Sequence, residues 1–307
     1  MFRLYWLSLS SVAVASASQS VRNDSSLVKL EVRTTLSIPS GQRIVGIATE
    51  SSERVLLWGP TNLWLLGAGR KPQQICERES KLNIVGAFFL SHGEIGVLDA
   101  QSRRVLRWQG VGTCAPWFRV PAGDARLLGI LSKNCALIVL SRGPSGDLFL
   151  STVDTMGKVG RTVRVPLLSP SIPREASDWA YLTAWAGGVV VGTHRLPGWW
   201  IAFDQDLKEI SHSLGISSRL LEISGVASRP VHLYLGPIVR IGQLFLQTMT
   251  DLTSRRRATV VYDSRGRMLR VTNRNSGMSL VVSMPGDSLI VGIQRELAVM
   301  AIYARAP

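Results

Sequence analysis

Residues 83–120 read NIVGAFFLSHGEIGVLDAQSRRVLRWQGVGTCAPWFRV and contain four short apolar runs separated by Gly, Ser and Asp. The runs are Asn83 to Leu90, Glu94 to Asp99, Arg103 to Trp108 and Thr113 to Val120. They are rich in Ile, Val, Leu, Phe and Trp, which favour strands, and turn-forming residues stand between them. The segment therefore predicts four short β-strands joined by tight turns.

The beginning of this segment recurs along the chain, as bulky apolar residues followed by a small one at the start of an apolar strand. The third positions of these triplets lie at 46, 86, 129, 183, 236 and 282, in steps of 40, 43, 54, 53 and 46 residues. Such a period is the length of a four-stranded propeller blade. The triplets are Ile44-Val45-Gly46, Ile84-Val85-Gly86, Leu127-Leu128-Gly129, Tyr234-Leu235-Gly236 and the weaker Tyr181-Leu182-Thr183 and Leu280-Val281-Val282.

The two ends of the chain complement each other. The sixth unit has only three strands, Met278 to Met284, Ser288 to Gln294 and Leu297 to Tyr303, whereas Leu30 to Pro39 has the alternation of an outer strand. Pairing that strand into the last unit would close a ring and remove unpaired edges. We expect an all-β, six-bladed β-propeller of four-stranded blades, with five or seven blades as the alternatives.

The N-terminal residues read as a signal peptide. Arg3 supplies a positive charge, Leu4 to Val14 is mostly apolar, and Ala15-Ser16-Ala17 has the small-x-small form of a cleavage site. The apolar run is shorter than the roughly 20 residues that span a bilayer. The predicted organisation is a signal peptide at 1–17, a short tail at 18–26 and a propeller at 27–307, in a secreted or periplasmic protein.

Hydrophobic residues make up 46% of the chain and charged residues 18%, with 28 Gly and 14 Pro, which suits many short buried strands. Aspartates recur at the same place in three units, at Asp154, Asp204 and Asp263. An aspartate that bonds its own backbone makes a hairpin turn, so these are predicted to be structural.

The chain has three cysteines, Cys76, Cys114 and Cys135, with no C-x-x-C spacing. That number is too small for a disulfide scaffold and the spacing does not indicate zinc or thiol redox chemistry. In an exported protein one pair would be bridged and one thiol left over; buried free cysteines are the alternative. The spacing does not choose the pair.

The second unit resembles a known family of repeats. Gly93 to Asp99, GEIGVLD, followed by Arg103 to Trp108, RRVLRW, is similar to the strand, aspartate turn and Arg-Val strand of NHL-type repeats in six-bladed propellers. The match is good in this unit only; the first unit has Trp58 where the aspartate would stand. Propellers of this kind include binding proteins, lyases, hydrolases and lactonases, so the resemblance implies the architecture and leaves the activity open.

No catalytic motif stands out. The carboxylates at Glu50, Glu94, Asp124, Asp178 and Asp287 fall on different loops, which disfavours a calcium site. There is no Gly-x-Ser-x-Gly elbow, and Gly110 to Ala115 fits a dinucleotide fingerprint only formally, because Pro and Trp follow where a helix should begin.

The histidines never stand at i, i+2 or i+4, so we expect solvated loop histidines and no cofactor. The alternative is a metal-dependent NHL-type lyase or hydrolase with its site at the mouth of the central channel. In that interpretation His194 and His232 contribute to a zinc site.

Charge is the one functional signal. Lys plus Arg exceeds Asp plus Glu by 14, and the chain has 29 Arg against 6 Lys. Arginine suits bidentate contact with carboxylate, sulfate or phosphate. The loops that lead into each blade, and the turns between second and third strands, should lie on one face. The basic ligand-binding residues predicted there are Arg43, Lys81, Arg103, Arg126, Arg195, Arg229, Arg255, Arg256 and Arg257.

The sequence therefore predicts an exported, non-enzymatic propeller that binds a protein or an anionic polymer through a basic face. Export disfavours nucleic acid as the partner. Trp199 and Trp200, after Pro197-Gly198, are expected to form an exposed contact pair. The oligomeric state is not indicated.

Overall fold

A computed structural model of the chain contains only β-strands as regular elements in the part it describes. The described residues are 29–37, 44–51, 54–67, 70–76, 82–90, 93–110, 113–133, 136–166, 178–185, 187–196, 198–216, 233–253, 257–272, 278–283, 289–294 and 298–305.

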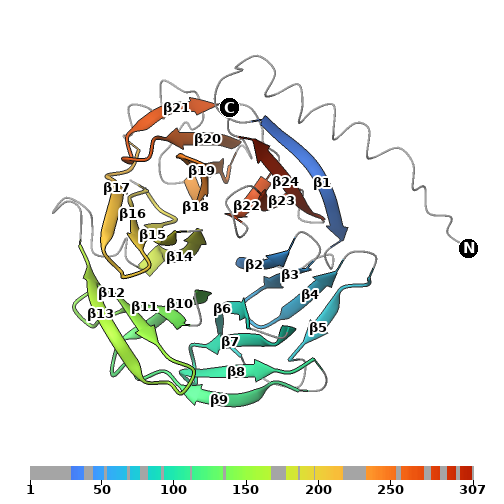
Figure 1. Ribbon diagram of the computed structural model, residues 1–307, viewed down its shortest axis with the longest axis vertical. Coiled ribbons are helices and arrows are strands. Elements are labelled where there is room, and N and C mark those ends of the chain that lie inside the picture. The colour runs from blue at the N-terminus through green and yellow to red at the C-terminus, as the bar shows by residue number, and fades with distance from the viewer. Residues whose placement is uncertain are drawn as a thin grey trace, which may run out of the picture.

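The strands form four-stranded antiparallel sheets arranged in a ring (Figure 1). Blade I comprises β2 (Gly46–Ser51), β3 (Arg54–Trp58), β4 (Leu63–Gly67) and β5 (Gln73–Ile75). Blade II comprises β6 (Ile84–Phe89), β7 (Ile95–Asp99), β8 (Arg104–Trp108) and β9 (Ala115–Arg119). Blade III comprises β10 (Arg126–Lys133), β11 (Ala136–Arg142), β12 (Leu148–Val153) and β13 (Val159–Val165). Blade IV comprises β14 (Ala180–Trp185), β15 (Gly188–Thr193), β16 (Trp200–Asp204) and β17 (Glu209–Ser213). Blade V comprises β18 (Leu233–Ile241), β19 (Leu244–Asp251), β20 (Arg257–Tyr262) and β21 (Met268–Thr272).

A further sheet joins the two ends of the chain. It has the order β1-β24-β23-β22, from β1 (Lys29–Ser37), β24 (Ala298–Arg305), β23 (Leu289–Gln294) and β22 (Met278–Ser283). β1 and β24 are antiparallel, with Lys29 opposite Arg305 and Ser37 opposite Ala298. The predicted outer strand at Leu30 to Pro39 therefore pairs with the C-terminal strand.

The prediction of an all-β propeller with four-stranded antiparallel blades is confirmed. In blade II each strand lies within its expected range, and the innermost strand of every blade begins at or beside one of the apolar triplets. The predicted signal peptide and tail, 1–26, lie outside the described residues. Within the described part, no helix is long and apolar enough to cross a membrane.

The small residue of the triplet has a packing role in blade II. A Cβ at Gly86 would lie 2.9 Å from the backbone nitrogen of Ile130, which belongs to the innermost strand of blade III. Only a residue without a side chain allows the two inner strands to approach so closely, because real Cβ contacts are longer than this.

The hydrophobic core is divided into clusters between neighbouring blades. Successive side chains of a strand point to opposite faces, and both faces of a blade are covered. Val189 and Val191 of β15 accordingly pack in the cluster between blades III and IV, whereas Val190 packs in the cluster between blades IV and V.

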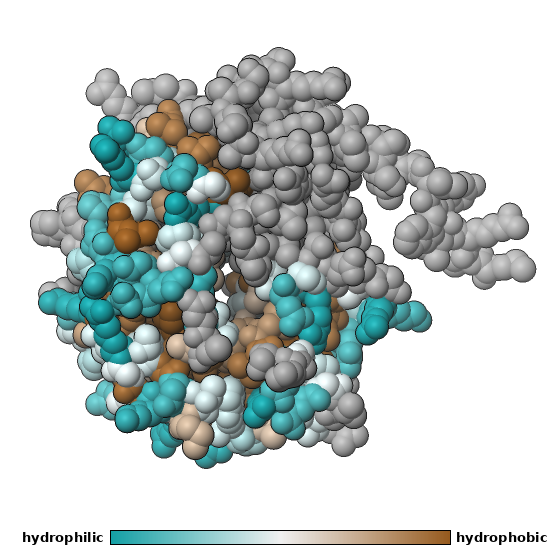
Figure 2. Space-filling model, viewed as in Figure 1, coloured by the Kyte–Doolittle hydropathy of each residue, from teal (hydrophilic) through white to brown (hydrophobic). Residues whose placement is uncertain are grey.

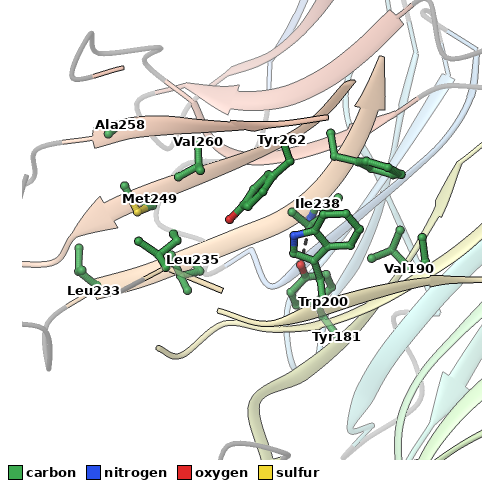
Figure 3. Packing of buried hydrophobic residues seen from close by; sticks show 13 residues of the cluster. Tyr181, Val190, Trp200, Leu233, Leu235, Ile238, Met249, Ala258, Val260 and Tyr262 are labelled. Carbon is green, nitrogen blue, oxygen red and sulfur yellow. Dashed lines mark hydrogen bonds between the residues drawn. The ribbon is translucent and has the colours of Figure 1, made fainter. Parts of the chain in front are cut away.

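The same alternation overturns the prediction for the tryptophan pair. Trp199 and Trp200 have no exposed surface; Trp199 packs in the cluster between blades III and IV, and Trp200 in the one between IV and V. The Trp200 ring lies 5.5 Å from that of Tyr262, between centroids (Figure 3). Its centroid is 4.7 Å from that of the Phe245 ring. The pair is core, not a contact surface.

The aspartate turns are structural, as predicted. The Asp154 carboxylate accepts hydrogen bonds from the backbone N–H groups of Met156 and Lys158, at 2.9 and 2.8 Å. Asp204 and Asp263 make the equivalent pairs of bonds. The residue at the left-handed position of the turn is Gly157, Leu207 or Gly266.

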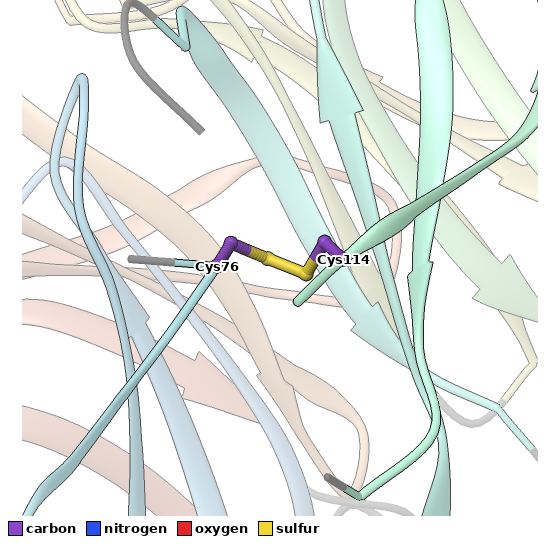
Figure 4. Close-up of a disulfide and its surroundings, with 2 residues drawn as sticks. All are labelled: Cys76 and Cys114. Atoms are coloured by element: carbon purple, nitrogen blue, oxygen red, sulfur yellow. A yellow bond between two sulfur atoms is a disulfide. The ribbon is translucent and has the colours of Figure 1, made fainter. Parts of the chain in front are cut away.

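A disulfide joins Cys76, after the last strand of blade I, to Cys114, before the last strand of blade II (Figure 4). Both cysteines are buried in the cluster between these blades. One pair of cysteines is thus bridged, which was one of the two alternatives that the sequence left open. The third cysteine, Cys135, lies outside the described residues.

Candidate functional site

One end of each blade carries the turn between its second and third strands and the connection that leads into its first strand. Strand pairing shows this directly, because Arg126 at the start of β10 lies opposite Arg142 at the end of β11. Ala180 and Thr193 hold the same places in blade IV. We call this end the basic face, after its described residues Arg103, Arg126, Arg142, Arg195 and Arg257.

The predicted ligand-binding residues divide between described and undescribed positions. Arg103, Arg126, Arg195 and Arg257 lie at the basic face. The others lie outside the described residues, as does His232: they are Arg43, Lys81, Arg229, Arg255 and Arg256.

Two arginines of blade III share one carboxylate of blade IV. Arg126 and Arg142 lie directly opposite each other on paired strands, an arrangement of like charges that is unfavourable by itself. The Asp178 Oδ1 lies 3.2 Å from Arg142 Nη1 and 3.7 Å from Arg126 Nη1. The second distance is an ion pair without a hydrogen bond, and the Arg126 side chain is 68% exposed. This cluster has one positive charge in excess.

An exposed tryptophan adjoins the cluster. Trp179 is 46% exposed, and the guanidinium of Arg195 lies 4.3 Å from the centroid of its ring. The His194 N–H also donates to the Trp179 carbonyl at 3.0 Å, which fixes the blade-IV turn against the connection that leads into β14. In the described part of this face, the exposed aromatic residue is Trp179 rather than the Trp199-Trp200 pair.

Arg103 and Arg257 are less exposed to solvent than Arg126. Arg103 has a left-handed backbone, φ 57°, and its guanidinium donates to the Gly123 carbonyl in the connection to blade III. Arg257 begins β20 and is partly buried.

The sequence pattern missed Arg142, because its relation to Arg126 depends on strand register.

The opposite face carries both signs of charge. Arg107 bonds Glu94, Arg54 lies 2.6 Å from Glu50, and His212 lies 2.7 Å from Glu209. The three aspartate turns belong to this end as well. Carboxylates of this end thus lie beside several of its basic side chains.

His194 is a packed residue, which corrects the expectation of a solvated loop histidine. Its ring lies between Tyr181 and Tyr234, with centroids 4.6 and 4.8 Å away. Nδ1 is 2.6 Å from the Leu235 carbonyl oxygen. Because a carbonyl only accepts, Nδ1 carries the proton and Nε2 keeps its lone pair. Burial lowers the pKa of His194 to about 4, against the opposing effect of the Leu235 carbonyl.

The low pKa of His194 predicts a pH dependence of stability. Between about pH 6.5 and pH 4 the unfolded chain binds a proton at this imidazole and the folded protein does not, so folding is favoured as pH rises. The contribution of His194 to the free energy of unfolding should be constant above pH 6.5 and should fall by about 2–3 kcal/mol toward pH 4. Urea denaturation at pH 7.5 and 4.5 measures this loss. His194→Phe keeps a ring between the two tyrosines and should remove the part of this loss that comes from His194. An unchanged loss in the variant would contradict the low pKa of His194.

No group of three His, Cys, Asp or Glu side chains that could hold a metal ion occurs among the described residues. Asp178 and Asp124 lie at the basic face, whereas Glu50 and Glu94 lie at the opposite end. The four carboxylates are thus not brought together. The metal-dependent lyase or hydrolase stays an untested alternative. The dinucleotide fingerprint at Gly110 to Ala115 is followed by strand β9 and not by a helix.

A cavity of about 600 Å³ follows the axis of the ring, along the inner strands β2, β6, β10 and β14. Its wall is mostly aliphatic and aromatic, and hydrophobic residues lie along the lower side of the hollow at the centre of the space-filling view (Figure 2). Arg126, Asp178 and Asn83 line its end at the basic face, and Lys133, Ser132 and Trp185 line the other end. We call this cavity the channel.

No protein-family model and no curated protein matches the chain. Among solved structures it is similar to a streptogramin B lyase, with TM-score 0.55, 9% identity and coverage of 88% of this chain and 81% of that one. Virginiamycin B lyase from Staphylococcus aureus gives TM-score 0.55, 9% identity and coverage of 90% and 99%. The WD40 propeller domain of Doa1 gives TM-score 0.49 at 9% identity, covering 89% and 96%. At such identities the likeness shows the propeller fold alone.

Proposed function

We propose that the chain is an exported, non-enzymatic six-bladed β-propeller that binds a protein or an anionic polymer through the basic face. In this proposal the sheet of β1, β24, β23 and β22 is the sixth blade and closes the ring. The disulfide between Cys76 and Cys114 supports export, because such bonds persist in oxidising compartments.

One observation carries the binding proposal: the topology gathers Arg103, Arg126, Arg142, Arg195 and Arg257 on one face. The cluster of Arg126 and Arg142 keeps a positive excess over Asp178, and the chain as a whole has a formal charge of +14. Such a surface attracts anions by electrostatic focusing, and the attraction weakens with salt. Trp179 adds an exposed ring for stacking beside the arginines.

The test compares two triple charge reversals that change the net charge equally. Arg255, Arg256 and Arg257 are changed to Glu in the β19–β20 turn, and Lys158, Lys208 and Arg265 are changed to Glu in the aspartate turns of the opposite face. Retention on immobilised heparin, as a sulfated polymer, is measured against salt. The first variant should bind about tenfold or more weakly at physiological salt, and the second should elute close to wild type.

Equal losses in the two variants would mean attraction by net charge alone and would overturn the assignment to this face. Absence of wild-type retention would overturn it too.

A further inference from the structure

The channel wall has an apolar middle. Leu128 and Leu131 of β10, and Leu182 and Ala184 of β14, are only partly buried and line the channel. Leu128, Leu131 and Leu182 also pack against the cluster between blades III and IV. The part of these side chains that stays uncovered gives the channel an apolar surface.

The same strand places a cation at each end of this surface. β10 begins at Arg126 and ends at Lys133, both of which line the channel. Seven strand steps separate them, a length of about 23 Å. The Lys133 ammonium donates to the Trp185 carbonyl, and the Arg240 guanidinium lies 4.1 Å from the Trp185 ring centroid. Both mouths therefore carry positive charge beside apolar walls.

Arg126 has hydrogen-bonding capacity left for a ligand. Within the described part of the chain its guanidinium makes the 3.7 Å ion pair with Asp178 and no hydrogen bond. A guanidinium has five N–H donors in a planar fork that matches a carboxylate. A ligand carboxylate at the mouth would occupy this fork without displacing Arg142 from Asp178.

We propose that the channel binds a small amphipathic carboxylate, with its head at Arg126 and its hydrocarbon tail along Leu128, Leu131 and Leu182. The volume of about 600 Å³ lies within the range of small-molecule sites. An elongated tail fits because the channel runs along whole strands, and an anionic head fits because both mouths are positive. This site shares Arg126 with the basic face, and its other residues belong to the inner strands.

Isothermal titration calorimetry with sodium dodecanoate, below its micelle concentration, tests the proposal on the purified protein. We expect one dodecanoate per chain and no comparable binding of dodecyltrimethylammonium, which has the same tail and the opposite charge. Arg126→Gln should weaken dodecanoate about tenfold, as the loss of one charge-assisted bond implies. Ala184→Trp should abolish binding by filling the channel, whereas Ala115→Trp, on the exposed strand β9, should leave it unchanged.

Ala184→Trp should retain wild-type behaviour on heparin, so failure of the channel site is distinguishable from failure of the basic face. If Ala184→Trp does not fold, Arg126→Gln decides, because that side chain is largely exposed. The proposal is overturned if dodecanoate does not bind, if the cationic detergent binds equally, or if binding is indifferent to Arg126→Gln.

Discussion

Replacing Trp200 by alanine is expected to lower the free energy of unfolding by about 4 kcal/mol, within the 3–5 kcal/mol typical of buried aromatic truncations. The side chain has no exposed surface and packs on Phe245 and Tyr262 between blades IV and V. Truncation leaves a cavity that two rigid sheets cannot collapse to fill. Urea denaturation followed by circular dichroism measures the change.

Trp179→Ala is the matched control, because this tryptophan is 46% exposed and touches Arg195 across an open surface. Its truncation should cost less than about 1 kcal/mol, the scale of an exposed cation–π contact. Similar losses at the two positions would contradict the assignment of Trp200 to the inter-blade core.

Removing the disulfide by Cys114→Ala is expected to cost about 4 kcal/mol. The bridge closes a loop with a sequence separation of 38 residues, and the chain-entropy relation gives that magnitude for such a loop. It also holds blades I and II together where both cysteines are buried. The midpoint of urea unfolding, with and without reductant, measures the effect.

Reductant provides the internal control. It should bring the wild type to the stability of Cys114→Ala and leave that variant unchanged. Destabilisation of the variant by reductant, or an oxidised wild type no more stable than the variant, would mean that the bridge is not what stabilises this pair of blades.

The blades could be predicted because the information is local. In the second unit, apolar runs and turn residues fixed all four strands, and the aspartate turns depend only on bonds within five residues, as at Asp154. The pairing of the N-terminal strand with β24 followed from counting strands in the last unit, since an unpaired edge is unfavourable.

The site could be predicted only in outline, because it depends on how one blade meets the next. Arg126 was expected at the basic face, but its relation to Asp178 crosses from blade III to blade IV. The burial of Trp200 and the packing of His194 between two tyrosines likewise require a neighbouring blade. Strand periodicity gives the two faces of a sheet, not what covers them.

The pairing of β1 with β24 also sets the order of events during biosynthesis. Lys29 and Arg305 are paired although nearly the whole described chain separates them. β1 leaves the ribosome long before its partner exists, and contacts between such distant segments form slowly. Blades I to V can assemble from neighbouring hairpins while translation continues. The strand that emerges first must therefore wait, with its edge unpaired, until β24 has been synthesised.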